Sequence, residues 1–166
     1  MITLTLTTYL EIMESHMSDW NTVEGEEALR IGKQAERAVV AGLAARGYRI
    51  KHIAEDPGHY NDGYDVLVNN KRTEIKSNSG VDERGHAYST CCVEKVTKIG
   101  RPIGWSQGKS DRVLFFNRSD RMLYVYEADR LHEWSRGRRT FLKHGADCLL
   151  MRWECPEAGY LCKVQL

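Results

Sequence analysis

The sequence predicts an α/β protein in which one long helix precedes a mixed β-sheet. Residues 22–46 have a helix-favouring composition, and the segments after them are short apolar runs separated by turn residues. A second, short helix is expected near residues 128–135, between two groups of strands. The 166 residues correspond to about one average domain. We therefore expect a single domain over residues 21–166, preceded by an N-terminal extension of residues 1–20.

The long helix has recognisable signals at both ends. Asn21 or Thr22 offers a side-chain oxygen for an N-cap, and Gly47 supplies a C-terminal stop. Between them the run AERAVVAGLAAR is rich in alanine, the residue with the highest helix propensity. Leu29, Val40 and Leu43 form one apolar stripe, which is expected to face the core.

The strands are expected where β-branched and aromatic residues gather between polar or glycine-rich segments. Asn117–Asp120 is a plausible hairpin turn between two such runs, and the last two runs are expected to form an extra C-terminal hairpin. The expected strands are 48–53, 64–68, 72–77, 89–96, 112–116, 122–126, 148–153 and 160–164.

Composition and charge exclude several classes of protein. The chain has 24 Lys and Arg against 23 Asp and Glu, a net charge of +1, which excludes a histone-like polycation. No apolar run approaches the roughly 20 residues that span a membrane, and the N-terminus lacks the features of a signal peptide. Five cysteines without a Cys-x-x-Cys pair favour reduced, structural thiols. We expect a cytoplasmic protein, encoded by a cell or by a phage within its host.

The most informative segment runs from Gly63 to Ser77. A turn at Asn69-Asn70 would place Asp65 directly opposite Glu74, whereas a turn centred one residue later would place it opposite Lys76. In both registers these three side chains share one face, because alternate residues of a strand point the same way. Ile75 points to the other face, but its carbonyl could still turn toward the acidic group.

Two adjacent carboxylates repel each other unless a cation lies between them. Hard oxygen ligands favour Mg²⁺ or Mn²⁺, and a nearby lysine can orient or deprotonate water or stabilise charge on phosphorus. The alternative is a solvent-facing strand that carries an ordinary Glu–Lys pair.

Glu36 is a third candidate carboxylate. It lies seven residues after Leu29 and seven before Leu43, so it interrupts the apolar stripe of the helix. A partly buried acid needs a partner or a metal ion. The alternative is a boundary glutamate paired with Lys33 or Arg37.

These motifs together resemble the PD-(D/E)XK nuclease superfamily, which includes restriction endonucleases and archaeal-type Holliday junction resolvases. The resemblance rests on Gly32-x-x-x-Glu36 in an alanine-rich helix, Gly47-Tyr48, Tyr64-Asp65 and Thr73-Glu74-Ile75-Lys76-Ser77, and covers roughly residues 27–135. It implies a restriction-endonuclease-like core, a central mixed β-sheet flanked by helices. Tyr64 departs from the proline in the motif's name.

The resemblance also implies roles for individual residues. Asp65 and Glu74 would bind Mg²⁺ or Mn²⁺ with the carbonyl of Ile75, Lys76 would be the catalytic lysine, and Glu36 would be the auxiliary carboxylate. The implied function is a metal-dependent endonuclease that hydrolyses DNA. Two alternatives stay open: a homodimeric Holliday junction or branched-DNA resolvase, and a catalytically silent nucleic-acid-binding module.

Basic residues dominate the chain between Lys95 and Lys143, although the total charge is nearly balanced. Lys and Arg supply much of the affinity of proteins for DNA. The candidates for contacts with backbone phosphates are Lys109, Arg136, Arg138 and Arg139. The alternative for each is a solvated surface position.

Overall fold

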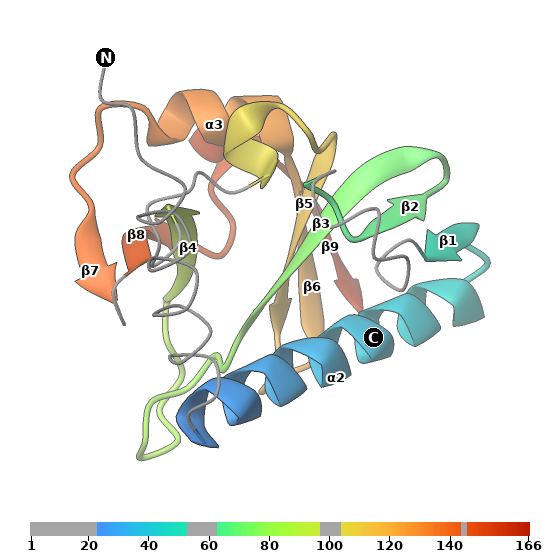
Figure 1. Cartoon of the computed structure of the whole chain (residues 1–166), viewed down its shortest axis with the longest axis horizontal. Coiled ribbons are helices and arrows are strands. Elements are labelled where there is room, and N and C mark those ends of the chain that lie inside the picture. Colours follow the sequence, from blue (N-terminus) through green and yellow to red (C-terminus); the bar gives the residue numbers. More distant parts are fainter. Residues whose placement is uncertain (1–22, 53–62, 97–103, 144–145) are drawn as a thin grey trace, which may run out of the picture. The chain divides into compact units, whose positions relative to one another are not determined.

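A computed structural model describes residues 23–52, 63–96, 104–143 and 146–166. The chain divides into two compact units, residues 1–34 and residues 35–166. The described part of the first unit is the N-terminal portion of helix α2, which spans Val23–Ala45. The expected N-cap residues Asn21 and Thr22 lie outside the described residues. The second unit contains the rest of α2 and all of the described strands (Figure 1).

The second unit is built on a mixed sheet with the strand order β1-β2-β3-β5-β6-β9. The pairing of β3 with β5 is parallel, and the other four pairings are antiparallel. This confirms the expected α/β class with a central mixed sheet. The strands are β1 (Ile50–His52), β2 (Val66–Val68), β3 (Lys71–Asn78), β5 (Arg112–Asn117), β6 (Met122–Glu127) and β9 (Tyr160–Gln165).

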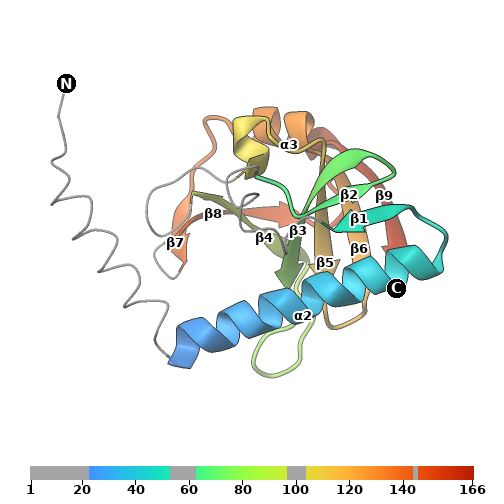
Figure 2. The ribbon, with the colours of Figure 1, turned by 45° about the vertical axis from the view of Figure 1, so that its right-hand side comes forward.

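A smaller antiparallel sheet has the order β4-β8-β7 (Figure 2). Its strands are β4 (Thr90–Val96), β7 (Phe141–Lys143) and β8 (Ala146–Arg152). The remaining elements are the short helix α3 (Ala128–Ser135) and the 3₁₀ turns η2 (Gly104–Gln107) and η3 (Pro156–Ala158). Within the described residues, no helix is long and apolar enough to cross a membrane.

The expected C-terminal hairpin is wrong. The strands β8 and β9 belong to different sheets, because β8 pairs with β4 and β7 whereas β9 pairs with β6. The 3₁₀ turn η3 between them redirects the chain from one sheet to the other, with Gly159 at φ 86°. The hairpin partner of β8 is β7, a short strand that the sequence did not indicate.

The two faces of the central sheet are covered differently. On one face, Ala35, Val39 and Leu43 of α2 pack against Leu114 and Phe116 of β5. The buried stripe of the helix therefore differs from the expected one, since Leu29 is 45% exposed. On the other face, the residues packed together are Val113, Phe115, Tyr126, Leu131, Leu149, Met151 and Trp105. This second cluster joins the central sheet to α3, to the small sheet and to η2.

Candidate metal centre

The β2–β3 hairpin fixes the position of the two central carboxylates. Asn69 and Asn70 form its two-residue turn with φ values of 48° and 65°, a left-handed conformation that asparagine tolerates. Val66 pairs with Thr73, so Asp65 lies opposite Glu74 one step further along. The backbone N–H of Asp65 extends the ladder by donating to the carbonyl of Thr73 at 3.0 Å. The first of the two registers considered from the sequence is therefore the observed one.

Glu74 is buried, with 5% of its surface exposed, and both of its carboxylate oxygens are engaged. Nζ of Lys76 lies 2.9 Å from Oε1. The backbone N–H of Trp105, the second residue of η2, donates to Oε2 at 2.9 Å. A buried carboxylate needs such partners because burial removes its hydration. The Glu–Lys pair is thus a feature of a protected site, which argues against the solvent-facing alternative.

Asp65 is a half-buried carboxylate that interacts with several charged side chains. Burial raises its pKa to about 6, although the hydrogen bond from the Ile75 N–H and the charge of Lys76 act to lower it. The charges of Glu74 and Glu36 add to the rise. The group therefore ionises close to neutral pH, because burial disfavours its charged form more than the Ile75 N–H and Lys76 favour it.

Lys76 remains charged in this environment. Burial acts to lower its pKa, but the charge and hydrogen bond of Glu74 and the charge of Asp65 outweigh burial, so the pKa lies above its usual value. The charge of Glu94 on β4 acts in the same direction. Lys76 is therefore an ammonium at neutral pH, which suits it to stabilising negative charge more than to removing a proton.

Glu36 acts on the site through its charge. It is half-buried on α2, between the buried residues Ala35 and Val39. Its carboxylate contributes to the raised pKa of Asp65. The interruption of the apolar stripe thus places a third negative charge near the hairpin.

Beyond the role expected of its carbonyl, Ile75 contributes a backbone hydrogen bond to the site. Its side chain packs with the α2 cluster, on the face opposite to Glu74 and Lys76, as the strand alternation predicts. Its backbone N–H donates to Oδ2 of Asp65 at 2.7 Å. This hydrogen bond fixes the orientation of the Asp65 side chain, a role that the sequence did not indicate.

The donor set fits a hard divalent cation with several open positions. Within the described residues, no three side chains of His, Cys, Asp or Glu gather closely enough to hold a metal ion by themselves. Asp65 and Glu74 offer carboxylate oxygens, each of which has lone pairs beyond the hydrogen bond it accepts. Mg²⁺ characteristically binds through one or two carboxylates and keeps several waters. The residues present fit a cation of this kind.

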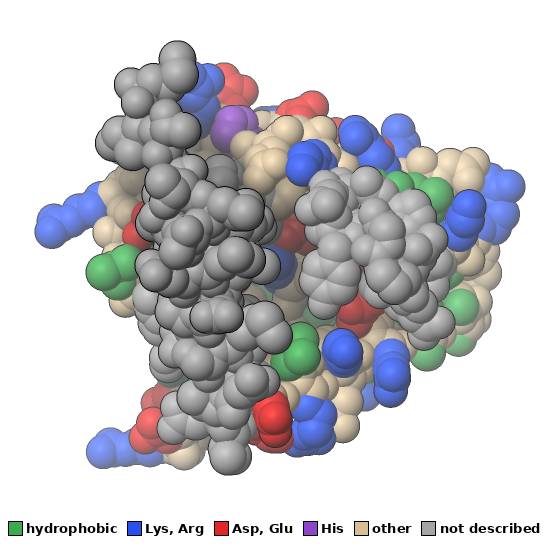
Figure 3. All heavy atoms as spheres, viewed as in Figure 1, with side chains coloured by type: hydrophobic (Ala, Val, Ile, Leu, Met, Phe, Trp, Pro, Cys, Tyr) green, Lys and Arg blue, Asp and Glu red, His purple; other side chains and the backbone are tan. Residues whose placement is uncertain are grey.

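The four basic residues proposed to contact DNA lie in two separate loops. Lys109 follows η2, and its N–H donates to the Gly104 carbonyl at 3.1 Å. Arg136, Arg138 and Arg139 are exposed residues between α3 and β7. Figure 3 shows Lys and Arg side chains at several places on one face, with Asp and Glu side chains among them.

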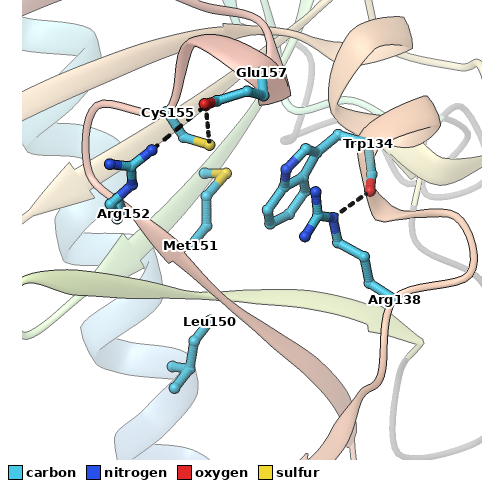
Figure 4. A pocket seen from close by; sticks show the side chains of 7 residues that line it. All are labelled: Trp134, Arg138, Leu150, Met151, Arg152, Cys155 and Glu157. Atoms are coloured by element: carbon cyan, nitrogen blue, oxygen red, sulfur yellow. Dashed lines mark hydrogen bonds and ion pairs between the residues drawn. The ribbon is translucent and has the colours of Figure 1, made fainter.

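A cavity of about 260 Å³ lies apart from the carboxylate pair, where α3, β8 and η3 approach one another (Figure 4). The guanidinium of Arg138 stacks over the ring of Trp134, 4.2 Å from its centroid, and donates to the Trp134 carbonyl. The lining residues are Trp134, Arg138, Leu150, Met151, Arg152, Cys155 and Glu157. Of the sequence candidates only Arg138 lines it, so this cavity is separate from the candidate metal centre.

The sequence did not indicate how η2 supports the site. Trp105 is fully buried in the core and presents its backbone N–H, not its side chain, to Glu74. A backbone donor carries no residue-type signal, so no pattern in the sequence could have identified it. The surrounding glycines and serines, Gly104, Gly108 and Ser110, are typical of a loop and say nothing about a contact with Glu74.

Comparisons with known proteins add little at the level of sequence. No family model and no curated protein matches the chain. Among solved structures, the chain is similar to a bacterial homing endonuclease, I-Ssp6803I, with a TM-score of 0.44 and 13% identity. The match covers 70% of this chain and 85% of that one.

Proposed function

We propose that the protein is a metal-dependent DNA endonuclease of the PD-(D/E)XK type that hydrolyses phosphodiester bonds. The observation that carries this proposal is the buried Glu74 carboxylate, with Lys76 bound at one oxygen and Asp65 opposite on the neighbouring strand. Two carboxylates and one ammonium on a hairpin of this register match the motif that the sequence resembles. An ordinary surface Glu–Lys pair would have no reason to be buried beside a second acid.

The chain's residues take distinct parts in this reaction. Asp65 and Glu74, with the carbonyl of Ile75, would hold Mg²⁺ or Mn²⁺, and Glu36 would add negative charge nearby. When bound, such a cation supplies Lewis-acid activation of water and of the phosphate. Lys76 orients the attacking water and stabilises the charge that develops on the phosphoryl oxygens. Its raised pKa favours these roles over that of a general base.

Substrate binding is assigned to the basic residues outside the hairpin. Lys109, close to the site through η2, and Arg136, Arg138 and Arg139 contact backbone phosphates. Such contacts position a duplex without reading its sequence. Because these residues lie in two separate loops, they suit a substrate longer than one nucleotide.

Cleavage assays on a panel of DNA substrates test this function. The panel contains linear duplex, flapped, single-stranded and four-way junction DNA, each with Mg²⁺, Mn²⁺ or EDTA. We expect cleavage of at least one substrate with either metal and none with EDTA. Preferential cleavage of the junction by a dimer would identify a resolvase.

Calorimetric titration with Mn²⁺ separates an enzyme from a silent module. We expect Mn²⁺ to bind to the wild-type protein and binding to weaken strongly in Asp65→Asn. DNA binding without Mn²⁺ binding and without cleavage would identify a silent nucleic-acid-binding module and overturn the proposal.

A further inference from the structure

The segment Gly104–Ser110, here called the 104–110 turn, is hydrogen-bonded to both segments that carry the candidate metal ligands, namely β3 and the residues directly before β2. At its start, Trp105 donates its N–H to Oε2 of Glu74 on β3. At its end, the buried Ser110 donates its Oγ–H to the carbonyl of Gly63 at 2.8 Å, two residues before Asp65. One short segment is therefore hydrogen-bonded on both sides of the carboxylate pair.

The 104–110 turn is also packed tightly against the segment Gly63–Asp65, which directly precedes β2. A Cβ added to Gly104 would lie 1.9 Å from the carbonyl oxygen of Gly63, so the two backbones touch. Gly63 has a φ of 72°, which a residue with a side chain rarely adopts. Both glycines are therefore required by this contact, because a side chain at either position would push the two segments apart.

The turn is itself held rigid from both ends. The Lys109 N–H donates to the Gly104 carbonyl at 3.1 Å, which closes the turn. The Trp105 side chain anchors it in the core, with no exposed surface. At the end that continues into β5, the N–H of Asp111 donates to the carbonyl of Arg72 at 2.7 Å, two residues before Glu74.

The two oxygens of Glu74 are held by donors of different kinds. Oε1 is paired with the long side chain of Lys76, which can move away. Oε2 is held by a backbone N–H of the rigid turn. The carboxylate thus keeps its orientation whatever occupies the Oε1 side. Groups that orient metal ligands in this way commonly change metal affinity by roughly 10- to 100-fold when they are removed.

We propose that the 104–110 turn positions the metal centre. Its Trp105 N–H holds Glu74, and its Ser110 hydroxyl holds the segment Gly63–Asp65, in the arrangement that binds the divalent cation. This inference rests on the proposed function. Ser110 acts as a positioning residue, because its hydroxyl reaches the site only through the backbone of Gly63.

Two buried serines allow a matched test. Ser110 is 2% exposed and donates to the Gly63 carbonyl at 2.8 Å, and Ser135 is fully buried and donates to the His132 carbonyl at 2.7 Å within α3. Ser110→Ala and Ser135→Ala each remove one buried hydroxyl and one hydrogen bond to a carbonyl, so both should lower the melting temperature similarly. We expect only Ser110→Ala to weaken Mn²⁺ binding, by about tenfold in calorimetry.

A second measurement, amide hydrogen exchange, monitors the 104–110 turn in the metal-free protein. Hydrogen exchange of the Trp105 amide reports its bond to Glu74, and we expect exchange to be faster in Ser110→Ala and unchanged in Ser135→Ala. In the wild-type protein, added Mn²⁺ should slow this exchange. The wild-type measurement does not depend on whether a variant folds.

The outcomes separate this inference from the proposed function. Unchanged Mn²⁺ affinity and unchanged Trp105 exchange in Ser110→Ala would overturn the positioning role. An equal loss of Mn²⁺ affinity in Ser110→Ala and Ser135→Ala would also overturn it. A wild-type protein that neither binds Mn²⁺ nor cleaves DNA would overturn the proposed function. In that case faster Trp105 exchange in Ser110→Ala alone would still establish that the turn orients Glu74.

Discussion

Lys76 and Glu74 form an ion pair in which Nζ lies 2.9 Å from Oε1, two residues apart on the same face of β3. The pair neutralises a carboxylate that is almost removed from solvent, since Glu74 is only 5% exposed. Within the described residues, Asp65, which directly precedes β2 and lies opposite Glu74, has no ion pair of this kind, and burial raises its pKa to about 6. The two carboxylates of the hairpin therefore carry one more negative charge than Lys76 balances, and Glu36 adds a third carboxylate nearby.

Replacing Lys76 with methionine should separate its catalytic role from the binding of metal. We expect Lys76→Met to reduce kcat for DNA cleavage by about 100-fold or more, because a positive charge near the reacting phosphate is lost. Mn²⁺ affinity should stay unchanged or increase, since Glu74 loses a competing cation. Steady-state cleavage assays and calorimetry measure the two quantities.

Lys163→Met provides the control for that substitution. Lys163 forms an ion pair with Glu154 at 2.7 Å, but both side chains are about half exposed, and Lys163 lies on β9. Its replacement should leave kcat unchanged. A Lys76→Met enzyme that is as active as the Lys163→Met enzyme would contradict the assigned role.

Mn²⁺ binding should depend on pH through Asp65. A metal binds the ionised carboxylate, so protonation competes with binding below the pKa of about 6. With one proton in competition, the affinity at pH 5 should be about tenfold lower than at pH 7. Calorimetric titrations at pH 5, 6, 7 and 8 measure this dependence. An affinity that stays constant from pH 5 to 7 would argue against Asp65 as a ligand.

The Asp65 carboxylate should destabilise the metal-free protein at high pH. The folded-state pKa of Asp65 lies above its ordinary value of 3.8. Its stabilising contribution is therefore fully present below pH 3.8 and is lost as the pH rises through about 6. We expect Asp65→Asn to stabilise the metal-free protein at pH 8 by about 1 to 3 kcal/mol. Thermal unfolding in EDTA at pH 8 and pH 4 measures this gain, which should shrink at the lower pH.

Asp111→Asn is the matched comparison, with the opposite sign. The hydrogen bond from Arg72 lowers the pKa of Asp111. Its ionised form is therefore favoured by folding, and Asp111→Asn should lower the melting temperature at pH 8. If both substitutions were destabilising at pH 8, the unfavourable burial of Asp65 would be disproved.

The turn of the β2–β3 hairpin should tolerate only residues that accept a positive φ. Asn70 has a φ of 65°, so we expect Asn70→Gly to be neutral or stabilising. We expect Asn70→Val to cost about 1 to 3 kcal/mol, because a β-branched residue is strained in this conformation. Urea unfolding of the two variants measures the difference. Equal stability would indicate a different turn, and with it a different register for Asp65 and Glu74.

The sequence was most informative where local signals determine structure. The stop of α2 at Gly47, which has a φ of 83°, and the Asn69-Asn70 turn are short-range features. The C-terminal end of the helix agrees with the structure, and so does one of the two hairpin registers that the sequence left open. The residues that share a face of β3 follow from strand alternation alone. These local features were enough to bring Asp65, Glu74 and Lys76 together.

The sequence was least informative where distant segments determine structure. The run 160–164 was correctly expected as a strand, but its pairing with β6 and not with β8 depends on packing across the whole sheet. Leu29 fits the helical period, yet it is exposed because the buried surface of α2 begins at Ala35. The donation from Trp105 to Glu74 joins residues 31 positions apart through a backbone group, which leaves no trace in residue type.

DNA cleavage by the wild-type protein and by Glu74→Gln, assayed in parallel with Mg²⁺ and with EDTA, tests whether Glu74 belongs to a metal-dependent nuclease site. The substituted amide would keep an acceptor for the Trp105 N–H but lose the charge that pairs with Lys76 and binds the cation. We expect Mg²⁺-dependent cleavage by the wild type, no cleavage in EDTA, and a loss of about 100-fold or more in Glu74→Gln. Full metal-dependent activity in Glu74→Gln would contradict it.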